Sequence, residues 1–130
     1  MTKEKMIVAN WKMKLGLSDT LELTQKVKDK FQNFTTGIVV ICPNFISLKE
    51  VGGIISGSPV KLGAQDAFWE DKGAYTGEIS PTMLVEAGCK YVIVGHSERR
   101  KYLMVNYEMI HRVVKAVLNE EDLIPIVCFW

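Results

Sequence analysis

Residues 91–100 read YVIVGHSERR, and the expected fold follows from this stretch. It begins with a continuous apolar run, residues 91–95, in which apolar and polar positions do not alternate. Such a run is typical of a strand in a parallel sheet that is covered on both faces. The polar segment that follows starts at His96. Its side chains are therefore expected at the carboxyl end of a strand, where parallel α/β sheets gather ligands.

Amphipathic segments alternate with short apolar runs along the rest of the chain. Four further runs, rich in valine and isoleucine, lie at 6–10, 38–42, 60–64 and 124–129. A first helix is expected from an N-cap at Ser18, with apolar residues at helical spacing as far as Phe34. A second helix is expected over residues 45–55. Ser80 followed by proline predicts the start of a third, and residues 106–119 carry the broad apolar stripe of a fourth.

This alternation of strand and helix predicts an α/β fold with a parallel sheet and right-handed crossover connections. The length of 130 residues suits one domain. The connection over residues 65–79 is long and irregular, and connections of that kind are more often functional than idle. We therefore expect a single domain whose ligand site lies at the carboxyl ends of its strands.

Composition excludes several classes of function. Hydrophobic residues make up 48% and the formal net charge is +1, which provides neither a basic surface for nucleic acid nor a polybasic membrane anchor. No run approaches the ~20 apolar residues of a membrane span. Cys42, Cys89 and Cys128 are widely spaced and lie in or beside apolar stretches. They are expected to be buried thiols in a reducing cytoplasm rather than a disulfide framework or a zinc site.

The strand ends bring a small set of polar side chains toward one rim. Asn10 and Lys12 follow the first run, Gln65 follows the third, and His96 and Glu98 follow the fourth. An ammonium suits a negative charge, an amide and an imidazole suit a carbonyl oxygen, and a carboxylate can pair with the ammonium. This inventory indicates a small anionic, oxygenated substrate.

Each of these residues also has a simpler interpretation. Taken alone, a lysine such as Lys12 after a strand is usually a solvated surface residue, and a lone histidine such as His96 is more often a structural hydrogen-bonding group. Residues 98–100 also suit a charged helix start. His111, on the last helix, is expected to be structural. No two histidines have ligand spacing, and no phosphate-binding glycine motif is present, so neither a metal nor a nucleotide cofactor is expected.

Three segments nevertheless resemble motifs of the triosephosphate isomerase family, and they occur in the family's order. They are residues 9–13 (ANWKM), residues 63–66 with 73–80 (GAQD and GAYTGEIS), and residues 91–100. The resemblance runs from about residue 6 to residue 128. It implies a partial (β/α)8 TIM barrel of about five parallel strands and four helices. Residues 1–130 would then form a single incomplete barrel domain, the N-terminal half.

The resemblance also implies a chemistry, the interconversion of dihydroxyacetone phosphate and glyceraldehyde 3-phosphate in glycolysis and gluconeogenesis, without a metal or organic cofactor. Asn10 and His96 would polarise the substrate carbonyl. Lys12 would bind the phosphate-bearing anion, and Glu98 would pair with Lys12. His96 and Lys12 are thus the expected catalytic residues, and Asn10 and Lys12 the expected substrate-binding residues.

A homodimer is implied as well. In the family, the loop that matches residues 65–79 inserts into a partner subunit. Gln65, Thr76 and Glu78 are therefore expected at a subunit interface. The implied partners are a small triose phosphate and a second copy of the chain, with no nucleic acid and no membrane.

The sequence departs from the family pattern in three respects. The family's general-base glutamate, its mobile lid and its main phosphate loops follow later strands than the five found here, so the isolated chain is expected to be inactive or weak. Residues 104–106 replace an acidic, often glycine-containing stretch. Residues 129–130 replace a small residue and a Gly-Glu pair, which is expected of a truncated or altered terminus.

Two other interpretations stay open at this stage. Five parallel strands in 130 residues also suit a self-contained, doubly wound, flavodoxin-like binding domain. A catalytically inactive fragment that associates with itself is the other. Strand order separates the first from a half barrel, because only a doubly wound sheet reverses its order at a switch point.

Overall fold

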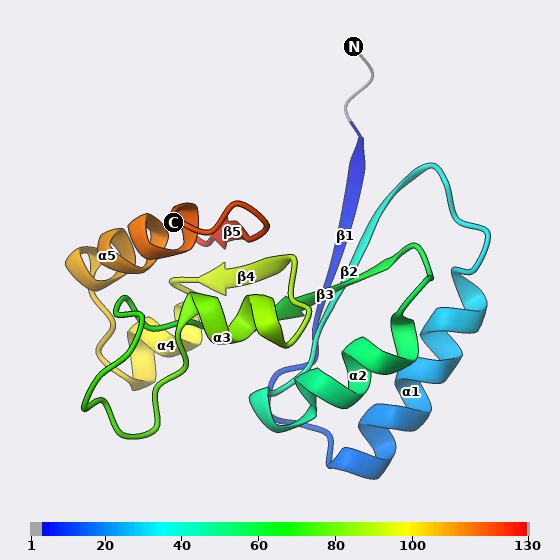
Figure 1. The fold of residues 1–130 in the computed structure, drawn as a ribbon, viewed down its shortest axis with the longest axis horizontal. Coiled ribbons are helices and arrows are strands. Elements are labelled where there is room, and N and C mark those ends of the chain that lie inside the picture. The colour runs from blue at the N-terminus through cyan, green and yellow to red at the C-terminus, as the bar shows by residue number, and fades with distance from the viewer. Residues whose placement is uncertain (1–3, 130) are drawn as a thin grey trace.

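A computed structural model describes residues 4–129 of the chain (Figure 1). These residues form five strands, five α-helices and one 3₁₀ helix. In chain order the elements are β1 (Lys5–Asn10), α1 (Leu17–Lys30), β2 (Gly37–Cys42), η1 (Phe45–Ser47), α2 (Leu48–Ile55), β3 (Val60–Ala64), α3 (Pro81–Glu86), β4 (Tyr91–Val94), α4 (Ser97–Tyr102), α5 (Tyr107–Leu118) and β5 (Ile124–Val127).

The sheet order is β1-β2-β3-β4-β5, and every pairing is parallel. Each strand therefore lies beside the next one in the sequence, and no switch point occurs within residues 4–129. This order confirms the expected partial (β/α)8 barrel and excludes a doubly wound sheet for the described residues. The structure has one α-helix more than the four expected, because the polar segment after β4 forms the separate short helix α4.

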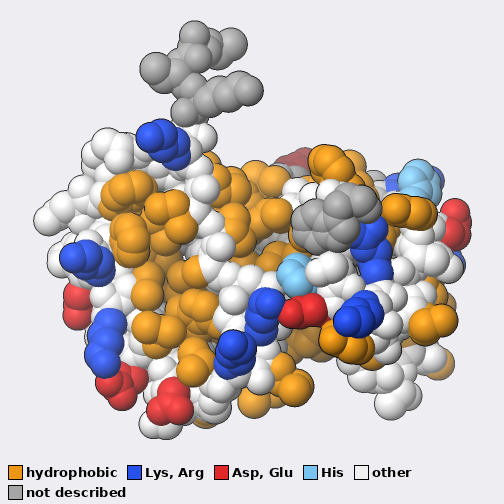
Figure 2. Space-filling view, turned by 180° about the vertical axis from the view of Figure 1, so that it is seen from behind, with side chains coloured by type: hydrophobic (Ala, Val, Ile, Leu, Met, Phe, Trp, Pro, Cys, Tyr) orange, Lys and Arg blue, Asp and Glu red, His pale blue; other side chains and the backbone are white. Residues whose placement is uncertain are grey.

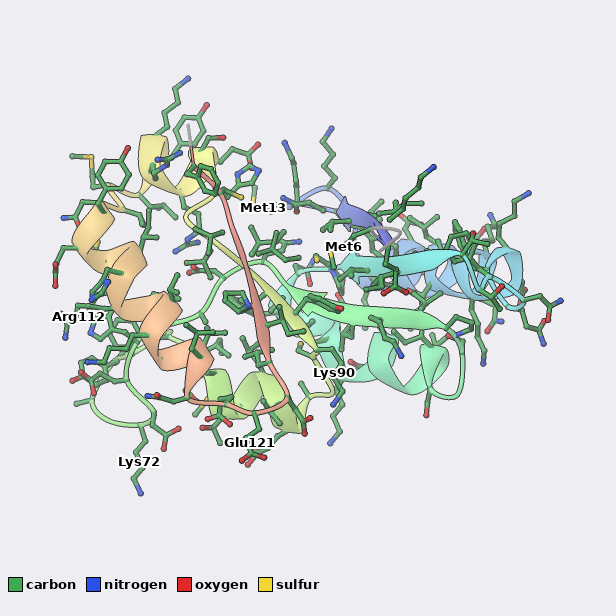
Figure 3. All side chains as sticks on the ribbon, turned by 90° about the horizontal axis from the view of Figure 1, so that it is seen from above. Met6, Met13, Lys72, Lys90, Arg112 and Glu121 are labelled. Atoms are coloured by element: carbon green, nitrogen blue, oxygen red, sulfur yellow. The ribbon has the colours of Figure 1, made fainter. Side chains whose placement is uncertain are left out.

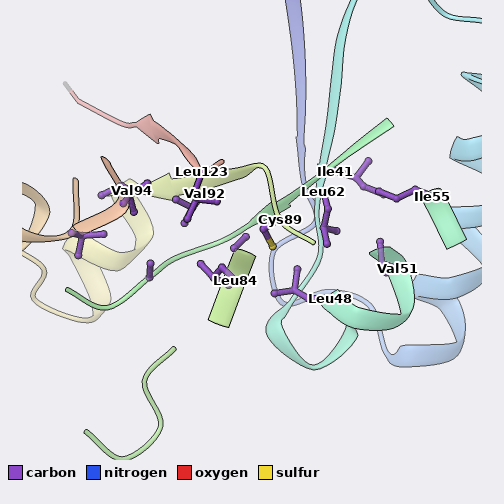
Figure 4. Packing of buried hydrophobic residues seen from close by; sticks show 14 of the residues in the cluster. Ile41, Leu48, Val51, Ile55, Leu62, Leu84, Cys89, Val92, Val94 and Leu123 are labelled. Atoms are coloured by element: carbon purple, nitrogen blue, oxygen red, sulfur yellow. The ribbon is translucent and has the colours of Figure 1, made fainter. Parts of the chain in front are cut away.

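The core lies between the sheet and the helices that cover one side of it. Figure 1 shows α1 and α2 side by side next to β1–β3, whereas α5 lies beside β4 and β5. In Figure 4, Ile41 of β2 and Leu62 of β3 face Val51 of α2, and Leu84 of α3 lies near Val92. All five are nearly inaccessible to solvent. A second, smaller cluster of buried residues occupies alternate positions of β2 and β4, namely Val40, Cys42, Tyr91 and Ile93. These central strands are therefore buried on both faces, which explains their continuous apolar runs.

The helix starts confirm one of the two expected caps and correct the other. Ser80 Oγ accepts the Met83 N–H at 3.2 Å and α3 begins with proline, as expected. Asn106 caps α5 in the same way. The expected cap at Ser18 is wrong, since α1 begins at Leu17 and Ser18 lies inside its first turn. None of the helices in residues 4–129 has the length and apolar character needed to cross a membrane.

The two outer strands leave apolar side chains exposed. Among the described strands, β1 pairs only with β2 and β5 pairs only with β4. On β1, Met6, Ile7 and Val8 keep 36–49% of their surface exposed, and Figure 2 shows a broad apolar area on this side of the molecule. Open apolar edges of this kind favour self-association. The expected self-association of the chain stays a prediction.

The long loop over residues 65–79 packs against α5. The guanidinium of Arg112 on α5 lies 4.4 Å from the centre of the Trp69 ring and forms a 3.6 Å ion pair with Glu70. In Figure 3, Lys72 of this loop and Arg112 lie at the same end of the molecule. The loop is therefore held at its N-terminal part, while residues 71–78 remain exposed.

Met104 adopts a backbone conformation that favours glycine, and it lies in the stretch where the sequence departs from the family pattern. Its φ is 58° and 78% of its surface is exposed, so its side chain offers little packing in return for the strain. We expect Met104→Gly to raise the free energy of unfolding by about 0.5–1 kcal/mol, after the greater freedom of glycine in the unfolded chain is subtracted. Urea denaturation measures the change. Met104→Ala is the control, because alanine keeps the strain. A glycine variant no more stable than the alanine variant contradicts the prediction.

Candidate active site at the strand ends

The parallel sheet brings the expected site residues to one edge. Asn10 is the last residue of β1, Gln65 follows β3 directly, and His96 lies two residues beyond β4. Together they line a hollow of about 430 Å³. Its full lining comprises Asn10, Lys12, Met13, Gln65, His96, Glu98, Arg99, Tyr102 and Leu103. Figure 2, which views the molecule from behind, shows a histidine beside acidic and basic side chains near the middle of the visible surface. The structure thus brings together the amide, ammonium, imidazole and carboxylate that the sequence places at the strand ends.

Lys12 connects the end of β1 to the start of α4. Its φ is 56°, a left-handed conformation that costs a non-glycine residue about 1 kcal/mol or more. The Lys12 N–H donates to Asn10 Oδ1 at 3.0 Å, and Lys12 Nζ donates to Glu98 Oε1 at 2.6 Å. The hydrogen bond from Lys12 is the main reason that the pKa of the Glu98 carboxyl lies below its usual value. Both side chains remain roughly half exposed, so water screens the pair.

The contacts of His96 determine which ring nitrogen carries the proton when the ring is neutral. Gly95, with a φ of 72°, turns the chain out of β4 so that His96 becomes the N-cap of α4. His96 Nδ1 accepts the Glu98 N–H at 3.2 Å. Nδ1 also lies 3.5 Å from Glu98 Oε2, which is too far for a hydrogen bond. Because the Nδ1 lone pair is already used, a neutral ring carries its proton on Nε2 and can donate from there.

Gln65 is engaged within its own chain. Its Nε2 donates to the carbonyl oxygen of Lys12 at 3.0 Å and to that of Cys42 at 2.9 Å. An amide nitrogen carries two hydrogens, so these two bonds use both of them. The other two residues expected at an interface, Thr76 and Glu78, are exposed and do not line the hollow.

Asp66 and Arg99 form an ion pair that the strand-end pattern alone does not reveal. Arg99 Nη2 lies 2.8 Å from Asp66 Oδ2, which ties the start of the long loop to α4. Burial raises the pKa of Asp66 to about 6, although the nearby guanidinium acts in the opposite direction. Both residues follow apolar runs in the sequence, but only the folded chain shows that they meet.

The described residues offer little support for a metal site or for a cysteine nucleophile. No group of three or more His, Cys, Asp and Glu side chains in residues 4–129 is arranged to hold a metal ion. The thiols of Cys42 and Cys89 are buried, and desolvation raises the pKa of each to about 12. These two cysteines are therefore core residues rather than nucleophiles. Cys128 is only partly buried.

Comparisons with known proteins agree with the geometry. A family model described as triosephosphate isomerase matches residues 5–129. The triosephosphate isomerase of Dictyoglomus turgidum is 44% identical over 126 residues, which cover 97% of this chain and 50% of that protein. That of Thermoanaerobacter pseudethanolicus is 46% identical with the same coverage. The crystal structure of the Bartonella henselae enzyme superposes with a TM-score of 0.88 at 31% identity, covering 95% of this chain and 51% of that one. The chain spans about half the length of the curated relatives it matches.

Proposed function

The chain belongs to the triosephosphate isomerase family, and on that basis we propose that its strand-end hollow binds a triose phosphate and serves the interconversion of dihydroxyacetone phosphate and glyceraldehyde 3-phosphate. The observation that carries the proposal is the Lys12 ammonium, held 2.6 Å from Glu98 Oε1 in a hollow that Asn10 and His96 also line. A cation beside an amide and an imidazole suits a small phosphorylated carbonyl compound.

The contacts support a separate role for each side chain. The Lys12 ammonium attracts the anionic substrate, while Glu98 holds that ammonium in place. Asn10 Oδ1 accepts the Lys12 N–H, so its Nδ2 amide group remains as a donor for the substrate carbonyl oxygen. His96 donates from Nε2 to the same oxygen as negative charge develops there in the enediolate. Lys12 therefore stabilises the charge of the anion, whereas Asn10 and His96 together stabilise the charge on the carbonyl oxygen.

Removal of the Lys12 ammonium tests this proposal directly. We expect Lys12→Met to weaken the binding of dihydroxyacetone phosphate at least about tenfold, because a charge-assisted hydrogen bond is lost. Isothermal titration calorimetry on the whole chain measures the affinity. Lys49→Met is the control, since Lys49 is exposed on α2 and does not line the hollow. Equal affinities for Lys12→Met and the unaltered chain would contradict the proposal.

We also propose that the chain associates with a second copy through residues 65–79. Support comes from the exposure of Thr76 and Glu78 and from the apolar side chains that surround the hollow. Met13 is 93% exposed and Tyr102 69%, and a partner loop would cover them. As part of the same proposal, the protein acts in the cytoplasm, in glycolysis or gluconeogenesis. The described cysteines, which are all free thiols, support this location.

A bulky charge in the long loop tests the association. Thr76→Arg places a guanidinium where a partner would pack, so we expect the mass measured by sedimentation equilibrium to fall toward that of the single chain. Ser56→Arg adds the same charge at the opposite end of the sheet, in an exposed position, and should leave the mass unchanged. The same mass for Thr76→Arg and the unaltered chain would reject this interface.

A further inference from the structure

Gln65 joins three strand ends through its side chain. The residue follows β3, while its two acceptors are the carbonyl oxygen of Cys42, at the end of β2, and that of Lys12, just beyond β1. The Cys42 carbonyl also accepts the Trp11 N–H at 3.1 Å. The short segment after β1 is therefore fastened to β2 by the main chain and to β3 by the Gln65 amide.

The Lys12 backbone is held by hydrogen bonds at both of its polar groups, in the peptide units before and after its Cα atom. Its N–H is bound by Asn10 Oδ1, and its carbonyl oxygen is bound by Gln65 Nε2. A left-handed conformation at a lysine persists only where the surroundings fix it. The Asn10 contact is local, two residues away, whereas the Gln65 contact comes from 53 residues away. Of the two groups that bind the Lys12 main chain, Gln65 is thus the one that ties this conformation to the rest of the sheet.

The backbone of Lys12 in turn determines where its ammonium lies. The left-handed turn directs the side chain toward α4, where Nζ meets Glu98 Oε1. We propose that Gln65 is a positioning residue that holds Lys12 in its left-handed conformation and so keeps the ammonium at the substrate hollow. The proposal rests on the function proposed above, because it assigns Gln65 to that site in addition to any place at an interface.

The Lys12–Glu98 contact provides a test that needs no ligand. Gln65→Met keeps the length of the side chain but removes both N–H donors. If Gln65 positions Lys12, the ammonium moves away from Glu98 in this variant, and the Glu98 carboxyl pKa rises to the value measured in Lys12→Met. The pKa is followed by carbon NMR during a pH titration. Ser58→Ala is the control: it removes a 2.7 Å hydrogen bond to the main chain at the opposite end of the sheet and should leave the Glu98 pKa unchanged.

Substrate affinity provides the second measurement. We expect Gln65→Met to bind dihydroxyacetone phosphate about tenfold more weakly than the unaltered chain, because a misplaced binding group loses much of its effect. In the Lys12→Met background, the same change should have no further effect, since Gln65 acts through Lys12. Should Gln65→Met fail to fold, Gln65→Asn, whose amide is one methylene too short to reach the two carbonyls, replaces it in both measurements.

The outcomes separate this inference from the proposed function. An unchanged Glu98 pKa together with an affinity within twofold of the unaltered chain overturns the positioning role. An effect of Gln65→Met that persists in full without Lys12 also overturns it. If the unaltered chain binds no dihydroxyacetone phosphate while the Glu98 pKa still rises in Gln65→Met, the proposed function fails and the positioning of Lys12 by Gln65 stands.

Discussion

A polypeptide of residues 1–130 is expected to isomerise dihydroxyacetone phosphate at least about 100-fold more slowly than a full-length relative, because residues 4–129 place no free carboxylate base at the hollow. Among the described lining residues, Glu98 is the only carboxylate, and it is bound to Lys12 Nζ at 2.6 Å. The described lining of the hollow therefore offers no free carboxylate for removal of the carbon-bound proton, the step that the proposed reaction requires. Under the proposed function, the groups present would stabilise an enediolate, but no described group of the lining would generate one.

A coupled assay for glyceraldehyde 3-phosphate measures this rate. The full-length Thermoanaerobacter pseudethanolicus enzyme, at the same concentration and temperature, is the reference. His96→Gln is the control for contaminating enzyme, since true residual turnover should fall when the imidazole is removed. Turnover of the polypeptide within tenfold of the reference would show that another group acts as the base.

Mixing experiments distinguish the enzyme from an inactive, self-associating fragment. A polypeptide that carries the half of the Thermoanaerobacter relative not matched here is expected to provide the glutamate and lid that the family resemblance implies. Activity that appears only in the mixture would show that the hollow of this chain is competent once a base is supplied. Association without activity would favour the inactive fragment.

The strands and most helix starts were predictable because the responsible interactions are local or periodic. Continuous apolarity placed β3 at Val60–Ala64 without error, since burial on both faces leaves no polar position within such a short strand except Lys61. Ser80 and Asn106 cap their helices through contacts only three residues along the chain. The same local pattern gives the wrong cap at Ser18. Gly16 is the N-cap of α1, and no side chain caps this helix.

The finer geometry of the site was not predictable, because its determinants lie far apart in the sequence. The pattern placed Asn10, Lys12, His96 and Glu98 at one rim, and the structure brings them together. It did not reveal the left-handed conformation of Lys12, whose support from Gln65 spans 53 residues. A lysine gives no local signal for such a conformation, whereas a glycine would.

Gly63 of β3 is the position where a substitution is expected to cost the most stability. A Cβ atom there would lie 2.5 Å from Cys42 Sγ and 2.9 Å from Val40 Cγ1, and both neighbours are fully buried in β2. Main-chain hydrogen bonds hold β2 against β3, so the strands cannot separate to make room for a larger side chain. We expect Gly63→Val to lower the free energy of unfolding by about 3 kcal/mol, at the upper end of the usual effect of overpacking.

Denaturation by urea measures this loss, and two variants establish its cause. Gly53→Ala, in α2, meets no atom within 4 Å and should raise the unfolding free energy by about 0.5–1 kcal/mol, as expected for glycine in a helix.

Cys42→Ala removes the nearest clashing atom, so the double variant with Gly63→Val should be more stable than Gly63→Val alone, although Cys42→Ala by itself removes core volume. Cys42→Ala would then lower the free energy of unfolding in the unaltered chain but raise it in the Gly63→Val variant, and this reversal is specific to relief of a steric clash. Additive losses in the double variant would instead mean that Gly63 acts through the backbone. Because Gly63 lies two residues before Gln65, displacement of β3 would then reach the Lys12 contact as well.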